Sequence, residues 1–580
     1  MRQNGASDLS AHHSTGAWAL GLLALFVAGP TIAQPVPQGP PLPRALPSAP
    51  LTAPAPAIIR PAQPAAIAVP DQLYPVAEIA IEGATLYPLS VLDGFFAGLG
   101  ATPSGAALGE ASQALLDRYR ADGYVFTTVS PGYNATTRRL TIRVVEARIA
   151  EVRLDGEIGP AAAQVQLFLN HLVQAGPINQ ATLERWLLLV QDMPGISIRA
   201  VLQPSDAEPG ALVLVAKLSR KPFDVLVSTS NRGASNLGPE GALLVIAGNS
   251  FTSLGERTEF SLLRSFNGTQ IFGQAASEFY VGASGLKLRV HAGSGTTDPF
   301  GSLRALGYHA VTTTAGLALS YPVVRSRQQS WAVGMTLDAL ETHNVNQAVG
   351  PGLVGRDNLR VVRLLSDYSH NDTWLGDARP AANSFALRLS QGVPVLGSSQ
   401  TGDRLAPRAG ERTGFSKIGF EAGRNQSLLH FGTTSSLAVQ TTLAGQFSRD
   451  VLPPAEKYFL GGDRLARGYY AGEVTGDTAV TASAELQLNS AWTTELFGAQ
   501  HTFGVQFFTF FDWGETWENQ AVDANHRLAS FGLGMRLFPW AGAQLDIEAV
   551  NRTVRYPLGR STGTVPLRAQ ALYWRVMTRF

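Results

Sequence analysis

The feature that most constrains the fold is an alternation of apolar and polar residues that begins after Lys221 and continues to the end of the chain. It is clear in the segments Leu286 to His291, Phe385 to Leu389 and Leu545 to Glu548. A period of two predicts β-strands with one apolar and one polar face. Beyond the first thirty-odd residues, no apolar stretch is long enough for a transmembrane helix. If this region enters a membrane, it must form a closed barrel, because only helices and closed barrels satisfy every backbone polar group in lipid.

The length of this region favours a transmembrane barrel over a soluble β-sandwich, which would give a similar alternation. Residues 221–580 are roughly 360 residues, which fits about sixteen antiparallel strands of about 10 residues with turns and long outer loops. Fifty-nine glycines and 9% aromatic residues suit many short strands joined by turns. The sequence therefore predicts a β-barrel over residues 221–580.

The N-terminus predicts export. Arg2 precedes an apolar run from Ala17 to Ala28, and the small-residue pattern ending at Ala33 follows. The run is too short to span a membrane and is typical of a cleaved signal peptide, residues 1–33. An uncleaved amphipathic anchor is the alternative. Residues 34–75 are rich in proline, which favours extended polyproline II and predicts a passive linker.

Two similar units follow the linker, over residues 76–146 and 147–220. The first reads as a strand from Ala77 to Gly83, helices over Ser90–Leu99 and Leu108–Asp122, and strands over 126–129 and 139–145, with a turn at 130–134 between them. The second repeats the order, with strands at 149–154, 196–202 and 211–218 and helices at 161–173 and 180–191. An internal repeat of whole folding units is strong evidence of domain organisation. Each unit is predicted to be a small α+β domain of order β-α-α-β-β.

Composition excludes several classes of function. The net charge is +1 and cysteine is absent, so no strongly basic face indicates nucleic acid and no cysteine-based zinc site can exist. The ten histidines are scattered, and we expect no metal and no cofactor. There is no Gly-x-Ser-x-Gly elbow, phosphate-binding loop or His-Glu-x-x-His helix, so we expect no enzyme.

One glycine-rich loop stands out in the last quarter, about residues 452–478. It contains Arg467-Gly468-Tyr469, with Gly461-Gly462 before and Gly476-Asp477 after. Some forty residues later, Phe511-Asp512-Trp513-Gly514 places a carboxylate in an aromatic strand that also holds Phe508 and Phe510. A charged, unpaired Asp512 among aromatic rings would be costly. Arg467 could bind it through two parallel hydrogen bonds. The alternative is that both are solvated charges without a special partner.

These features resemble a known family. Two β-α-α-β-β units after a signal peptide look like the polypeptide-transport-associated (POTRA) modules of the outer-membrane assembly superfamily. The Arg467-Gly468-Tyr469 loop and the Phe511-Asp512-x-Gly514 strand resemble the paired motifs of two-partner secretion transporters, the haemolysin secretion/activation protein family. The terminal strand from Leu572, which ends on Phe580, resembles the closing strand and insertion signal of bacterial outer-membrane barrels.

The resemblance implies an outer-membrane transporter with its modules in the periplasm. It implies that the Arg467 loop folds into the lumen and meets Asp512 on the wall. The expected partners are a secreted cargo protein with an N-terminal secretion domain, outer-membrane lipids and the barrel-assembly machinery, with no nucleic acid. The cargo itself, an adhesin, a cytolysin or an enzyme, is not readable from this chain. Family members commonly begin with a short plug helix, and none is readable in residues 34–75.

The first module offers a candidate cargo site. A sheet edge beside an amphipathic helix can bind an extended segment by β-augmentation. We expect that groove between the strand residues Phe126 and Val129 and the helix residues Leu116 and Tyr119. Two alternatives stay open: a factor that inserts other proteins into the outer membrane, and a diffusion porin, which would not need the modules.

Overall fold

The computed structural model describes residues 58–59, 67–206, 208–300, 304, 307–346, 353–432, 434–496, 499–560 and 565–580. The predicted signal peptide, residues 1–33, and most of the predicted linker lie outside the described residues. Among the described residues, no helix is long and apolar enough to cross a membrane.

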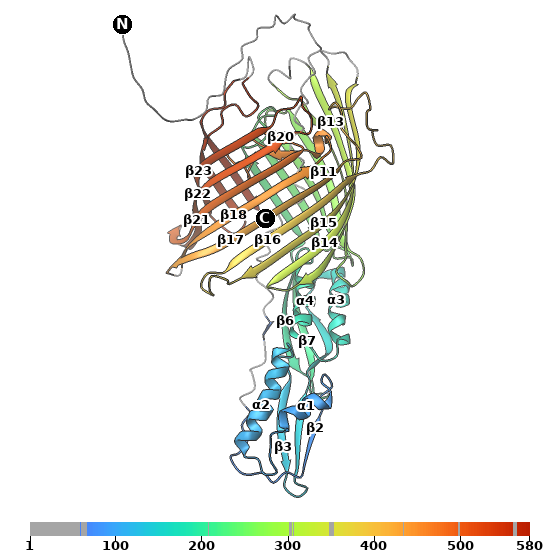
Figure 1. The fold of residues 1–580 in the computed structure, drawn as a ribbon, viewed down its shortest axis with the longest axis vertical. Helices are drawn as coiled ribbons and strands as arrows, with labels where there is room; N and C mark the ends of the chain where they lie inside the picture. Colours follow the sequence, from blue (N-terminus) through green and yellow to red (C-terminus); the bar gives the residue numbers. More distant parts are fainter. Residues whose placement is uncertain are drawn as a thin grey trace, which may run out of the picture. The chain divides into compact units, whose positions relative to one another are not determined.

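The first module has the predicted order of elements (Figure 1). It comprises β2 Glu78–Glu82, α1 Leu89–Phe96, α2 Gly105–Ala121, β3 Thr128–Asn134 and β4 Arg139–Val145. Ser104 caps α2, since its hydroxyl accepts a hydrogen bond from the Ala107 N–H at 3.2 Å. The sheet order is β2-β4-β3, with β2 parallel and β3 antiparallel to β4. Strand β3 therefore has a free outer edge within this three-stranded sheet.

The turn predicted at 130–134 is wrong, because β3 runs through these residues to Asn134. Pro131 and Gly132 signal a turn in most contexts. Proline is tolerated in an edge strand, where its missing N–H faces away from the ladder. The chain reverses instead after Asn134, whose side chain accepts hydrogen bonds from the N–H groups of Thr136 and Thr137 at 3.0 and 3.2 Å.

The second module repeats the topology of the first. It comprises β5 Arg148–Asp155, the 3-10 turn η1 Gly159–Ala161, α3 Ala162–Gln174, α4 Gln180–Gln191, β6 Ile196–Pro204 and β7 Ala211–Arg220. Strand β5 pairs parallel and β6 antiparallel with β7. A short strand of the linker, β1 Ile58–Ile59, adds to the outer edge of β6. Each module has its own apolar core.

Sixteen antiparallel strands of the described chain close into a barrel, which confirms the predicted fold class (Figure 1). They are β8 Phe223–Ser230, β9 Gly241–Asn249, β10 Arg257–Ser265, β11 Gln270–Tyr280, β12 Lys287–Thr297, β13 Tyr308–Arg325, β14 Gln329–Asn346, β15 Leu353–Asp372, β16 Ala381–Gly392, β17 Ser416–Phe431, β18 Ser435–Ser448, β21 Thr478–Leu496, β22 Ala499–Trp517, β23 His526–Phe538, β24 Ala543–Arg552 and β25 Gln570–Arg579. Closure is made by β25 against β8, with Arg575–Arg579 opposite Leu226–Ser230.

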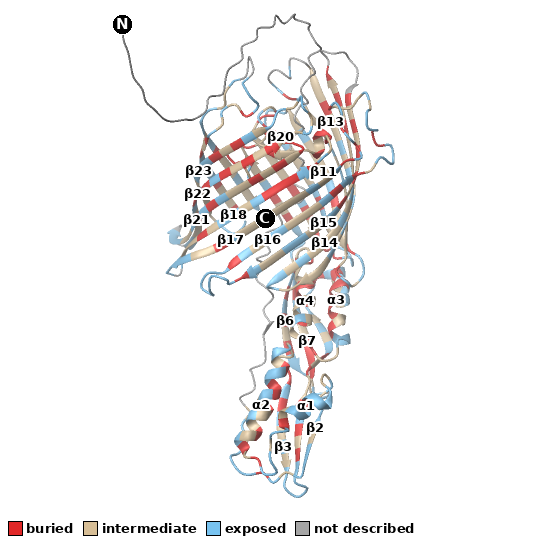
Figure 2. Cartoon of the chain, in the orientation of Figure 1, coloured by how far each residue is buried: buried red, intermediate tan, exposed pale blue. Residues whose placement is uncertain are grey.

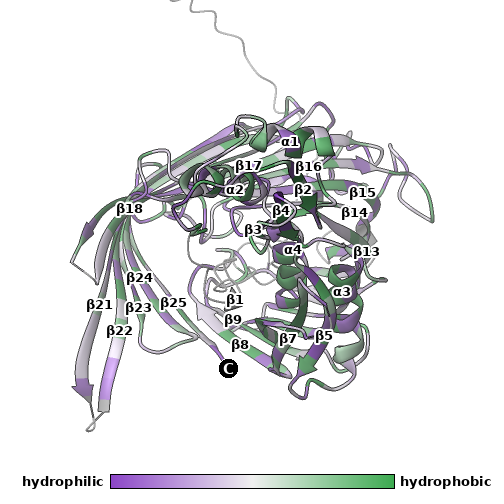
Figure 3. Cartoon of the chain, turned by 90° about the horizontal axis from the view of Figure 1, so that it is seen from below, coloured by the Kyte–Doolittle hydropathy of each residue, from purple (hydrophilic) through white to green (hydrophobic). Residues whose placement is uncertain are grey.

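The alternation in sequence sorts side chains between the two faces of the wall. In β22, Phe511 is 53% exposed, whereas Phe510 and Asp512 are 3% and 0% exposed. Exposed and buried residues alternate along the strands (Figure 2), and the hydropathy colour changes repeatedly along single strands (Figure 3). An apolar outer face and a filled polar interior are typical of transmembrane barrels.

One long connection, residues 449–477 between β18 and β21, supplies the loop predicted from sequence. It contains a 3-10 turn, η2 Pro454–Glu456, and a small hairpin, β19 Tyr458–Leu460 with β20 Val474–Gly476. Leu460, Ala466, Tyr469 and Val474 of this loop are buried with Leu528 of β23. The loop is therefore packed against the inner wall of the barrel.

Candidate functional site in the barrel lumen

The structure brings Arg467 and Asp512 together. The guanidinium donates from Nε to Asp512 Oδ2 and from Nη2 to Oδ1, both at 2.9 Å. The Arg467 backbone N–H donates to Oδ2 at 2.7 Å. Arg467 is 4% and Asp512 0% exposed. The carboxylate therefore fixes both the side chain and the backbone of the loop at this point.

Two further charges extend this pair into a cluster. Glu485 of β21 contacts the Arg467 guanidinium and also accepts from Arg536 Nη1 of β23 at 2.6 Å. Ser483 donates to Asp512 Oδ1 at 2.7 Å. We call Arg467, Asp512, Glu485, Ser483 and Arg536 the lumen cluster. Its formal charges balance, so no charge of the cluster is left without an opposite one.

Two phenylalanine rings of β22 pack against the guanidinium groups of the cluster. The Arg467 guanidinium lies 3.8 Å from the centre of the Phe510 ring, and that of Arg536 lies 3.9 Å from the centre of the Phe508 ring. A cation over an aromatic face is attracted by the negative face of the ring. Trp513, which the sequence also placed beside Asp512, alternates to the outer face of the strand. Two of the three expected aromatic neighbours are thus present.

Gly468 and Tyr469 fix the loop to the neighbouring strands. The Gly468 N–H donates to Ser530 Oγ at 3.1 Å, and its carbonyl accepts from the Tyr573 hydroxyl at 3.1 Å. A side chain at 468 would collide with Ser530, since a Cβ there would lie 2.4 Å from that of Ser530. The Tyr469 hydroxyl donates to the Ala529 carbonyl at 2.9 Å. All three motif residues of the loop therefore contact the wall.

In the wall motif, Phe511 and Gly514 lie on opposite faces. Phe511 points outward, so it offers apolar surface to the surroundings of the barrel rather than to the loop. A Cβ at Gly514 would lie 2.7 Å from the Leu460 side chain of β19. Glycine at 514 thus lets the loop hairpin pack closely on β22.

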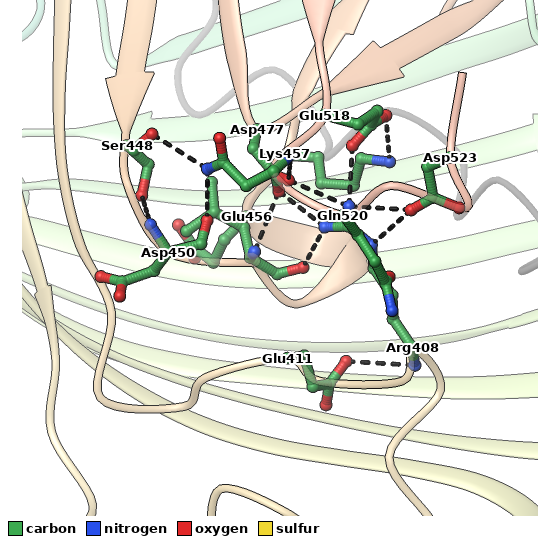
Figure 4. Close-up of polar contacts among 12 residues, drawn as sticks. Arg408, Glu411, Ser448, Asp450, Glu456, Lys457, Asp477, Glu518, Gln520 and Asp523 are labelled. Carbon is green, nitrogen blue, oxygen red and sulfur yellow. Dashed lines mark hydrogen bonds and ion pairs between the residues drawn. The ribbon is translucent and has the colours of Figure 1, made fainter. Parts of the chain in front are cut away.

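A second charged cluster, which the sequence did not predict, joins three loops at one end of the barrel (Figure 4). Arg408, between β16 and β17, donates from Nη1 and Nη2 to the two Asp477 oxygens at 2.6 and 2.9 Å. Its Nη2 also contacts Glu518 Oε2 and its Nε contacts Asp523 Oδ2, at 2.8 and 3.0 Å. Lys457 completes this mouth cluster with an ion pair to Glu518 at 2.6 Å.

Asp477 is the centre of the mouth cluster. It is fully buried and also accepts backbone hydrogen bonds from Leu452 and Asn519 at 2.9 and 2.8 Å. Burial alone would raise the pKa of Asp477, but the hydrogen bonds from Arg408 and the Asn519 backbone hold that pKa below its usual value. Asp477 is therefore a carboxylate that ties the base of the in-folded loop to two neighbouring loops.

Three of the four candidate cargo contacts are core residues of the first module. Leu116, Tyr119 and Val129 are 4%, 0% and 5% exposed and belong to the core of that module. Phe126 packs instead against the core of the second module. The helix face identified by its spacing is the one that packs on the sheet, so Leu116, Tyr119 and Val129 offer no free surface to a cargo segment, whereas Phe126 is partly buried.

Phe580 ends the barrel beside its first strand. Its N–H donates to the Val225 carbonyl at 2.9 Å and its carbonyl accepts from the Val225 N–H at 3.2 Å. The ring is 65% exposed. Phe580 therefore extends the closing seam between β25 and β8 by one pair of backbone hydrogen bonds.

No described group of three or more histidine, aspartate or glutamate side chains is arranged to hold a metal ion. The charges of the lumen and mouth clusters are paired with one another. What this arrangement can do is hold a loop in the lumen through reversible ionic contacts.

A closed sixteen-stranded barrel with a loop held inside it, preceded by two α+β modules, defines the class of outer-membrane barrels that carry periplasmic modules. The family model described as haemolysin secretion/activation protein ShlB/FhaC/HecB matches residues 210–537. The chain belongs to this family.

Solved structures of the same fold include CdiB from Escherichia coli and CdiB from Acinetobacter baumannii. The first is 18% identical with a TM-score of 0.69, covering 88% of this chain and 91% of that one. The second is 16% identical with a TM-score of 0.58, covering 90% and 93%. No curated protein sequence matches the chain.

Family membership makes the protein an outer-membrane two-partner secretion transporter, which exports a secreted partner protein. Its modules lie in the periplasm. Successive strand connections alternate between the two ends of the barrel, and β8 directly follows the second module. The loops that carry Arg408, Arg467 and Glu518 are therefore on the extracellular side.

Proposed function

We propose that the first module captures an extended N-terminal segment of the cargo and that the Arg467 loop closes the lumen until the cargo passes. The observation that carries this proposal is the lumen cluster. A loop fixed by three hydrogen bonds to one buried carboxylate occupies the interior through which a chain would have to move.

Ionic contacts are suited to a loop that closes the lumen, leaves it while cargo passes and then returns. The lumen cluster holds the loop at its tip and the mouth cluster holds it at its base. Each guanidinium could exchange its carboxylate for water or for a polar group of the passing chain without exposing an apolar core. The cargo's own folding at the cell surface supplies direction, because folded cargo cannot return through the barrel.

The free outer edge of β3 supports capture in the periplasm. An edge strand presents unpaired N–H and C=O groups, which an extended segment can use for β-augmentation. Binding through the backbone at this edge does not require the buried side chains of Leu116, Tyr119 and Val129. The cargo site is then the edge of β3 and the groove between β3 and α2.

Deletion of Val76 to Glu146 with the barrel retained tests the capture step. We expect export of the cargo protein to be abolished, while a heat-modifiable barrel still reaches the outer membrane. Undiminished export by the deletion variant would contradict the proposal.

A further inference from the structure

Residues 67–75, which the sequence assigned to a passive linker, lie in the groove between α2 and β3. We call this segment the strap. Tyr74 is 5% exposed and is part of the first module's core. Its ring packs edge-on against Tyr133 of β3, with 5.1 Å between the ring centres. The Tyr133 hydroxyl donates to the Pro75 carbonyl at 2.7 Å. The end of the linker is therefore built into the module.

Two glycines of α2 allow the strap to lie close to this helix. Gly105 and Gly109 lie one turn apart on α2, toward the strap. A Cβ at Gly105 would lie 2.0 Å from the Pro70 carbonyl oxygen, and one at Gly109 would lie 3.4 Å from the Ile67 carbonyl oxygen. The two glycines thus let a second backbone approach the helix closely, which is a use specific to glycine.

In the first part of the strap, the burial of successive side chains alternates, as it does in an extended peptide bound to a surface. Ile67 and Val69 are partly buried against the module's core, and Ala68 between them is exposed. Below them lies a cavity of about 510 Å³, whose other walls include Leu108 of α2 and Pro131 of β3. The strap therefore covers the groove without filling it.

The linker also occupies the corresponding edge of the second module. Strand β6 has the same place in its sheet as β3 has in the first, at the outer edge beside the last strand of the module. Ile58 and Ile59 pair with Ala200 and Val201 of β6 in parallel. Two parts of one linker thus lie against the groove of the first module and on the strand edge of the second.

We propose that the strap is an exchangeable, internal occupant of the cargo groove, so that an arriving cargo segment must displace Ile67 to Pro70 to bind; this rests on the proposed capture function. The segment that fits is extended, with small or branched apolar residues two apart, as in Ile67 and Val69. A tethered competitor acts at an effective concentration of about the millimolar range, so weak or mismatched segments are excluded. Tyr74 stays in the core and keeps the strap in position to return.

The first test measures access to the groove with a labelled synthetic peptide of residues 64–73 and the purified full-length protein. The variant is I67D/V69D, which loosens the strap and leaves the groove walls unchanged. The matched control is L89D/V91D, with the same spacing and charge at two exposed residues of α1. We expect the strap variant to bind the peptide at least tenfold more tightly than the wild type and the control to match the wild type. Equal binding by all three proteins would overturn the proposal.

The second test closes the groove and does not depend on the Asp variant folding well. The chain has no cysteine, so the pair I67C/G109C can form only one disulfide within a molecule, and a disulfide between molecules is recognised by its size on a non-reducing gel. We expect cargo export by the oxidised pair to be at least tenfold lower than export by the same protein after reduction, which serves as the control. If the oxidised pair exports normally but deletion of the module abolishes export, the strap proposal is wrong and the capture function stands. If the deletion variant also exports, the capture function itself is wrong.

Discussion

The modules and the barrel interior are stabilised by different kinds of contact. In the second module, Phe168, Leu169 and Val190 are 0% exposed and are surrounded by other buried apolar side chains. The barrel interior at the loop buries Arg467, Asp512 and Glu485 instead. The apolar contacts of a small domain core are lost together, because such a domain unfolds cooperatively. Ionic contacts in a lumen can be broken singly, which suits a loop that has to move while the wall around it stays closed.

The largest effect is expected from the lumen cluster. R467A leaves Asp512 buried beside Phe510, and breaking a buried pair on one side typically costs about 3–5 kcal/mol, a figure that lumen water reduces. We expect a lower temperature for the loss of the heat-modifiable barrel, together with reduced export. R467K should rescue only partly, because an ammonium cannot reproduce the two-pronged contact. R464A is the control, since Arg464 lies in the same loop but its side chain is 68% exposed.

A double-mutant cycle decides whether Arg467 and Asp512 act as a unit. In that case R467A/D512A should be scarcely worse than either single variant in heat-stability and in export. The contact of Arg467 with Glu485 leaves a residual effect of R467A in the D512A background, and E485Q should remove it. Strictly additive losses would mean that the two motifs work independently.

The next largest effect is expected from the apolar core of a module. L169A removes a fully buried side chain of α3, and such changes cost about 2–5 kcal/mol. L167A is the matched control, because Leu167 on the same helix is 44% exposed. We expect faster proteolysis of the modules in L169A and an unchanged heat transition of the barrel. If L169A shifted the heat transition of the barrel as much as R467A does, the modules and the barrel interior would not be stabilised independently.

The sequence predicted the strands and their faces better than the contacts between them. Alternation in β22 places Asp512 on the inner face with Phe510, and the family motif adds Arg467. Neither gives Glu485 or Arg408, because the neighbours of a residue across a barrel depend on the register of strands and on the course of loops. Arg408 is one of three arginines in its loop, with Arg404 and Arg412, and no local pattern distinguishes it from the other two.

The modules show a second limit. The helical spacing of Leu116 and Tyr119 was identified correctly as one face, but spacing alone does not tell a core-facing surface from a binding surface. The proline-rich composition of residues 34–75 predicted an unpacked spacer throughout. The strap packs nevertheless, because Tyr74 and the glycines of α2 supply contacts that the composition of the linker does not reveal.

A smaller effect is expected at the closing seam. Deleting Phe580 removes two backbone hydrogen bonds to Val225, each of which contributes about 0.5–1.5 kcal/mol. We expect less folded barrel in the outer membrane, measured by heat-modifiability. F580A keeps both hydrogen bonds and lacks only the ring. A loss in F580A equal to that of the deletion would assign the effect to the aromatic insertion signal, and normal levels in both would place that signal elsewhere.

The last effect is a pH dependence, which concerns a carboxyl pair beside the mouth cluster. Glu411, in the loop of Arg408, is 2% exposed and accepts a hydrogen bond on Oε2 from the Arg408 N–H at 3.2 Å, and the Asp357 carboxyl group beside it is also buried. Burial, and then the charge of Asp357, raise the pKa of Glu411 from 4.5 to about 10.

The sign of the resulting pH dependence follows from proton uptake. The unfolded chain releases the Glu411 proton above about pH 4.5, whereas the folded protein keeps it until about pH 10, so stability falls as pH rises through this window. We expect E411Q, which keeps a donor at all pH values, to flatten the decline of barrel heat-stability between pH 5 and pH 10. The control E240Q changes an exposed loop residue and should follow the wild type. A wild-type profile in E411Q would show that this pair does not fasten the Arg408 loop, and the ionic contacts of Asp477 would then be its main attachment.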